Sequence, residues 1–137
     1  MSVHLFVPRR SDDAWFFVVP ETELGDFRFV PLDTAQAIAD EALATGVPLI
    51  GRIAPCRRDE ARCYSIRAAA GGERLALLEL ERDAKGAWKP HRLKATAAAA
   101  RDDLALRLAA SWLALQYAKR DVREAHALSH PAAKVPA

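Results

Sequence analysis

Residues 62–93 read RCYSIRAAAGGERLALLELERDAKGAWKPHRL, and this stretch decides the fold class. It contains three strand-like runs, residues 63–68, 73–82 and 87–93. Gly71-Gly72 separates the first two runs, and glycine accepts the positive φ angles of a tight turn at little cost. A second short turn, residues 83–86, separates the last two. Three strands joined by short turns predict an antiparallel meander, in which Pro90 places the last strand at a sheet edge or on a bulge.

Upstream of the meander, the chain predicts additional strands and one helix. Asp33 is a good N-cap residue and Gly46 is a typical helix end, so residues 33–45 predict a helix. The apolar run of residues 14–19 is typical of a central strand that is covered on both faces. Three further short runs are strand-like: residues 3–7, 27–30 and 47–53.

Downstream of the meander, residues 103–119 predict the main part of a long helix that runs to about residue 127. Its apolar residues fall on two opposite sides when they are placed at about 100° per residue. One sector of about 80° holds Leu104, Leu108, Trp112 and Leu115. The opposite sector, about 40° wide, holds Leu106, Leu113 and Tyr117. An ordinary surface helix has a single apolar stripe, so this helix needs two packing partners.

We expect the sector that begins at Leu104 to lie on the sheet. For the opposite sector two alternatives stay open. It covers the alanine-rich helix of residues 33–45, or it stays exposed until a partner protein or a second copy of the chain buries it. Three such side chains would supply on the order of 5 kcal/mol to a complex, since each contributes about 1.5–3 kcal/mol when fully buried.

Together, these elements predict a single α+β domain. We expect an antiparallel sheet of about five or six strands, which includes the three-stranded meander, packed by the long C-terminal helix and the shorter helix. A chain of 137 residues suits one domain, here residues 1–130, followed by a flexible tail at residues 131–137. The longest apolar run is far shorter than the roughly 20 residues of a membrane span, and the N-terminus has no signal-peptide pattern. We therefore expect a cytoplasmic protein with no membrane partner.

Charge is divided unevenly along the chain. Residues 1–60 hold 6 Lys and Arg against 10 Asp and Glu, whereas residues 61–137 hold 14 against 8. This division predicts either that the two halves pair inside the domain or that the second half exposes a basic surface. A basic surface would suit nucleic acid, because cations neutralise phosphates and an aromatic ring stacks on a base. The candidate residues for that contact are Arg57, Arg58, Lys85, Trp88, Lys89, Arg92 and Lys94.

Regular strand alternation weakens the nucleic-acid hypothesis. It predicts that Trp88, Pro90 and Arg92 point to one face of the sheet, and that Lys89 and His91 point to the other. The positive charge would then be divided between two surfaces. The alternative is a solvated edge strand whose lysines prevent edge-to-edge aggregation.

The sequence contains no motif that indicates catalysis, a cofactor or a metal. No serine lies in a GxSxG context, and Gly71-Gly72 lacks the Lys-Ser/Thr pair and the helix that follow a phosphate-binding loop. Cys56 and Cys63 are seven residues apart, without the close spacing of zinc ligands, and are expected to be reduced thiols. We therefore expect a non-enzymatic protein without cofactor or metal.

The predicted function follows from the long helix. We expect a small interaction protein that binds a protein partner, or itself as a homodimer, through Leu106, Leu113 and Tyr117. The alternative is a nucleic-acid-binding accessory protein that uses the basic edge strand.

Overall fold

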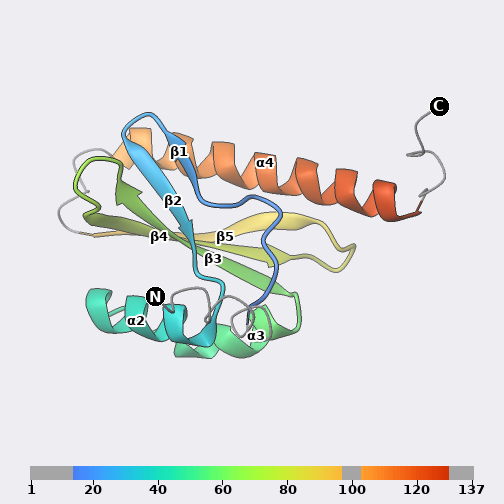
Figure 1. Ribbon diagram of the computed structural model, residues 1–137, viewed down its shortest axis with the longest axis horizontal. Helices are drawn as coiled ribbons and strands as arrows, with labels where there is room; N and C mark the ends of the chain where they lie inside the picture. Colours follow the sequence, from blue (N-terminus) through green and yellow to red (C-terminus); the bar gives the residue numbers. More distant parts are fainter. Residues whose placement is uncertain (1–13, 97–102, 130–137) are drawn as a thin grey trace, which may run out of the picture.

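The computed structural model describes residues 14–96 and 103–129. They form three layers, in which a five-stranded antiparallel sheet lies between one long helix and two short ones (Figure 1). Helix α4 (Asp103–Ser129) covers one face of the sheet, and α2 (Ala35–Thr45) and α3 (Ile53–Arg57) cover the other. The predicted α+β class is confirmed. Because α2 and α4 lie on opposite faces, the prediction that α4 covers the shorter helix is wrong.

The five strands follow one another across the sheet in chain order. They are β1 (Thr22–Leu24), β2 (Phe27–Pro31), β3 (Ala61–Ala68), β4 (Arg74–Arg82) and β5 (Trp88–Ala95). Strand β2 and the meander β3-β4-β5 confirm the prediction, whereas β1 has no counterpart among the predicted strands. The strand predicted at residues 3–7 and the tail predicted at residues 131–137 lie outside the described residues.

Glycine makes both turns of the meander possible. The φ angles lie between 73° and 88° at Gly71, Gly72 and Gly86. A residue with a Cβ atom is strained at such angles, which explains why the turns fall at these positions. Pro90 lies in the edge strand, where the pairing of β4 with β5 shifts register. Both predicted positions of Pro90, an edge and a bulge, are therefore confirmed.

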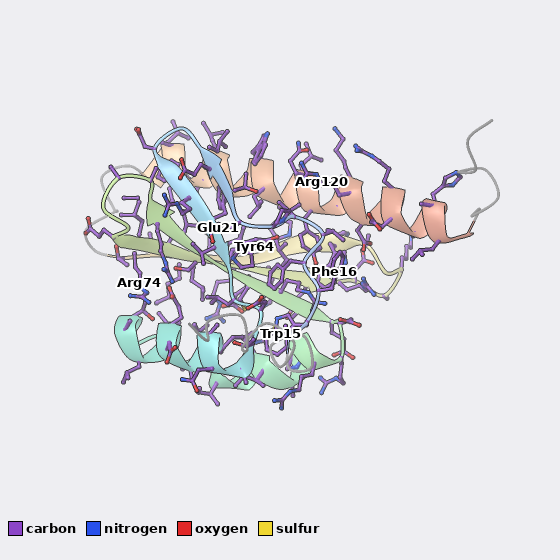
Figure 2. All side chains as sticks on the ribbon, in the orientation of Figure 1. Trp15, Phe16, Glu21, Tyr64, Arg74 and Arg120 are labelled. Atoms are coloured by element: carbon purple, nitrogen blue, oxygen red, sulfur yellow. The ribbon has the colours of Figure 1, made fainter. Side chains whose placement is uncertain are left out.

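The main core lies between the sheet and α4. The largest apolar side chains that β3 and β4 bury on this face are Tyr64, Ile66, Leu78 and Leu80. The rings of Tyr64 and Tyr117 meet edge to face, with their centroids 6.2 Å apart. Figure 2 shows Tyr64 in the middle of the sheet. This aromatic contact ties the helix to the two central strands.

The apolar run of residues 14–19 is a loop, not the central strand that the sequence predicts. Its buried side chains are Trp15, Phe17 and Val19. The indole of Trp15 donates to the carbonyl oxygen of Leu32 at 3.0 Å, and the hydroxyl of Tyr64 donates to that of Val19 at 2.6 Å. The prediction fails because an apolar run requires burial, and this loop obtains burial without pairing to a strand.

The strand predicted at residues 47–53 is also absent. This segment forms a 3-10 turn over Ile50–Arg52 that leads directly into α3. Pro48 has no N–H to donate to a neighbouring strand, and Gly51 has no side chain to pack. Both properties disfavour a strand. The sequence prediction gave too much weight to the apolar residues between them.

Helix α2 confirms the predicted helix but begins one residue later than expected. The N-cap is Thr34, whose hydroxyl oxygen accepts from the amide of Ala37 at 3.0 Å, and not Asp33. The predicted end is confirmed, since Gly46 has a φ of 75° and its amide donates to the carbonyl of Ala42 at 2.8 Å.

Candidate functional site

Helix α4 has two apolar faces, but their orientation is the reverse of the prediction. The inner face, which the sheet covers, consists of Leu106, Leu113 and Tyr117. None of the three is more than 2% exposed. The sheet therefore covers the residues that were predicted to bind a partner, and the predicted role does not fit their orientation. Three small buried residues lie beside them: Ala109, Ala110 and Ala114. Small and large side chains together let the helix and the sheet interdigitate closely on this face.

The opposite face of α4 carries four exposed aliphatic side chains, which we call the outer stripe: Leu104, Leu108, Leu115 and Val122. They are 55% to 68% exposed. At about 100° per residue they fall within about 40° of one another. Of the four residues that were predicted to lie on the sheet, Trp112 does so, because its ring stacks on Phe29 at a centroid distance of 6.4 Å. The other three are the leucines of the outer stripe, and for them the prediction is wrong.

Basic residues border the outer stripe at its C-terminal end. A shallow hollow of about 580 Å³ is lined there by Ala118, Lys119, Val122, Arg123 and His126. The C-terminal end of α4 extends past the sheet (Figure 1), and most side chains after Tyr117 are exposed. An ion pair between Arg82 and Asp121, at 3.7 Å, ties the start of this extension to β4.

Trp88 cannot serve as the predicted stacking surface for a base. Its side chain is buried and lies under the guanidinium of Arg82, 4.6 Å from the ring centroid. The ring also meets Tyr117 edge to face at 5.3 Å. Trp88 is therefore part of the core beneath α4, and the nucleic-acid hypothesis loses its aromatic residue.

The bulge in β5 brings the cations of this strand onto one face. Across the ladder, Lys89 lies opposite Glu81 and Arg92 lies opposite Glu79. Alternate residues of one strand share a face, so Lys89 and Arg92 share the face of Glu79 and Glu81. The predicted division of these cations between two faces is wrong, because an extra residue at the bulge reverses the alternation.

Carboxylates neutralise much of this charge. Two ion pairs link β5 to the acids beside it: Lys89 with Asp83 at 3.2 Å and Arg92 with Glu79 at 3.6 Å. Nδ1 of His91 lies 3.3 Å from a carboxylate oxygen of Glu81. In the other predicted basic segment, Arg58 pairs with Glu60 at 3.0 Å. Arg57 and Lys85 are exposed. The predicted nucleic-acid residues thus form a mixed surface with acids among them.

A buried carboxylate joins the acidic and basic halves of the chain. Glu41 of α2 is 1% exposed and accepts from the hydroxyl of Ser65 at 2.7 Å and from Nε of Arg74 at 2.9 Å. It also pairs with Arg67 at 3.3 Å. Two guanidinium groups and a hydroxyl offset the cost of burying one carboxylate. The predicted pairing of the two halves is confirmed here, although the sequence analysis did not identify these residues.

The two cysteines are free, as expected, and both are buried. A hydrogen bond with Cys56 and burial raise the pKa of the Cys63 thiol above its ordinary value, so this thiol stays protonated. Within residues 14–96 and 103–129, no group of three or more His, Cys, Asp and Glu side chains is placed to hold a metal ion.

Among the helices of the described part of the chain, none is long and apolar enough to span a membrane. Comparison of the sequence and the fold with protein-family models, curated proteins and solved structures finds no match. The candidate features for a functional site are the outer stripe of α4 and the polar groups on the opposite side of the sheet.

Proposed function

We propose that the protein is a small interaction protein that pairs with a second copy of itself through the outer stripe of α4. The observation that carries this proposal is the exposure of four aliphatic side chains in one narrow sector of one helix. Contiguous apolar patches on the surface of a single chain mark interaction sites more often than chance. The helix is the predicted binding element, but the binding face is the outer one.

The spacing of the outer stripe supports a second copy as the partner. A closed pair with two-fold symmetry uses the same patch twice, so the patch must be complementary to itself. Leu108, Leu115 and Val122 are seven residues apart, and the small residues Ser111 and Ala118 lie between them. In an antiparallel pair, the large side chains of one helix fit beside the small ones of the other, as in paired helices with a seven-residue repeat.

The energy of this contact predicts a weak dimer. A leucine or valine side chain contributes about 1.5–3 kcal/mol when it is fully buried. The outer stripe is already partly covered, so four side chains on each copy supply on the order of 10 kcal/mol. Association costs about 4–15 kcal/mol. At the lower bound of this cost about 6 kcal/mol remains, which corresponds to a dissociation constant of roughly 40 μM.

Light scattering over a series of micromolar concentrations tests the proposal. We expect the wild-type chain to shift from monomer to dimer, and Leu115→Glu to stay monomeric with an unchanged circular dichroism spectrum. Leu43→Glu is the matched control, because Leu43 is a lone leucine of α2 that is 87% exposed on the other side of the molecule. A wild-type chain that is monomeric throughout, or a control that dissociates equally, would overturn the proposal.

Nucleic-acid binding, the alternative function, has less support. Its aromatic residue, Trp88, is buried, and two of its cations, Lys89 and Arg92, face carboxylates. Phosphate contacts weaken steeply with salt, so a fluorescence anisotropy titration at low salt is the sensitive test. Absence of binding there removes this alternative.

A further inference from the structure

A second feature lies on the face of the sheet that α4 does not cover. A cavity of about 180 Å³ opens where α2 ends and the ends of β4 and β5 meet. Its lining includes Thr45, Arg74, Lys94 and Thr96. This volume equals about six water molecules at roughly 30 Å³ each, so it suits a small group and not a large ligand. Figure 2 shows Arg74 near α2, at this end of the sheet.

The cavity has an excess of positive charge. Arg74 directs its Nε to Glu41, and Arg67 pairs with the same carboxylate, so two guanidinium groups share one negative charge. Lys94 shares the cavity wall, and it forms no ion pair with any residue in the described ranges. Within this set, three cations stand against one carboxylate.

The cavity also contains a hydroxyl without a partner. The Oγ1 atom of Thr96 is enclosed and makes no hydrogen bond to the described residues. A buried polar group in this condition destabilises the folded chain, and most such groups in proteins have a partner. The amide of Thr96 donates to the carbonyl of Leu75 at 2.8 Å, which fixes the backbone that carries this hydroxyl.

We propose that this cavity binds a phosphate group, held by Arg74, Lys94 and Thr96. Because Glu41 occupies Nε of Arg74, the two terminal nitrogens of this guanidinium remain as donors to phosphate oxygens. Lys94 supplies a point charge and Thr96 supplies a hydroxyl donor. Glu41 acts as a positioning residue, since Ser65 and Arg67 hold it and it in turn holds the guanidinium of Arg74.

The phosphate group has two sources, the free ion and a phosphomonoester, and titration of the full-length chain separates them. Inorganic phosphate and glycerol phosphate are added in turn at constant ionic strength, and amide chemical shifts are recorded by NMR. We expect saturable shifts at Thr45, Arg74, Lys94 and Thr96. Saturation by inorganic phosphate alone assigns the free ion, and saturation also by the ester assigns a phosphomonoester. Shifts that never saturate, or that equal amounts of chloride reproduce, would overturn the proposal.

Two conservative variants and one control sharpen the test. Lys94→Met and Thr96→Val each keep the size of the side chain and remove a donor, and we expect each to weaken phosphate binding about tenfold, the loss of one charge-assisted or hydroxyl contact. Lys85→Met is the control, because Lys85 is an exposed lysine in the β4-β5 turn, outside the cavity. Equal affinity in all three variants and the wild type would contradict the assignment. Leu115→Glu should bind phosphate normally, so failure of the α4 proposal stays distinct from failure of this one.

Discussion

The two faces of α4 have nearly the same apolar content, yet the protein treats them in opposite ways. The inner face, centred on Leu113, is buried, whereas the outer face, centred on Leu115, is exposed. The difference lies in the neighbours. Beside the inner face stand Ala109, Ala110 and Ala114, which are small and buried, whereas Lys119 and Arg123 border the outer one. Ser111 and Ala118 give the outer face small residues too, so the comparison teaches that small neighbours mark the side of a helix that meets a sheet only where no charged side chain borders them.

The largest expected contrast comes from one substitution made on each face. Leu113→Ala removes fully buried atoms and leaves a cavity, so we expect it to lower the free energy of unfolding by about 2–5 kcal/mol. Leu115→Ala removes atoms that are mostly in water, and we expect a loss below about 1 kcal/mol. Urea denaturation followed by circular dichroism measures both. Equal losses of unfolding free energy in the two variants would show that Leu113 and Leu115 do not differ in burial.

A smaller contrast tests the role of the small residues. Ala110→Leu adds atoms between the helix and the sheet, and we expect overpacking to cost about 1–3 kcal/mol. Ala105→Leu, on an exposed turn of the same helix, is the matched control and should change stability by less than about 0.5 kcal/mol. If Ala110→Leu is tolerated as well as the control, close approach does not explain the choice of face.

The smallest effect concerns pH. Burial raises the pKa of Tyr117 on the inner face above its ordinary value, so the folded protein keeps this phenol neutral. The unfolded chain ionises it at about pH 10, and stability that is complete below this pH is therefore lost as the pH rises above it. We expect a loss of roughly 1.4 kcal/mol per pH unit from this residue.

Denaturation between neutral pH and strongly alkaline pH checks this expectation. Tyr117→Phe should be less sensitive to alkali than the wild type, although Tyr64, whose pKa burial also raises, still contributes to the loss. An identical pH dependence in the two proteins would mean that Tyr117 is not buried against the sheet.

Much of the fold could be predicted because local signals agreed with one another. In the meander, alternating residues define three strands, and Gly71, Gly72 and Gly86 fall where the backbone needs positive φ angles. The loop at residues 14–19 was not predictable in the same way. Its apolar side chains show only that burial is required, and a side chain can be buried without its backbone pairing in a sheet.

The candidate sites were harder to predict because they depend on how elements meet. The helical period reveals two apolar stripes on α4 but does not say which one faces the sheet. Pro90 makes a bulge possible at this position. Only the register of the β4-β5 pairing, however, shows which face of the sheet Arg92 lies on. Likewise, Arg74, Lys94 and Thr96 carry no common motif, and they meet only because β4 pairs with β5 beside the end of α2.

The central claim is that the outer stripe joins two copies of the chain, and a distance between two spin labels tests it most directly. Ser111→Cys places a label near the middle of the outer stripe, where an antiparallel pair brings the two copies of residue 111 together. The account predicts a short, well-defined distance between labels at high micromolar concentration, which disappears when Leu115→Glu is added to the same chain. A label that reports no neighbouring copy, or the same distance in both chains, would contradict the claim.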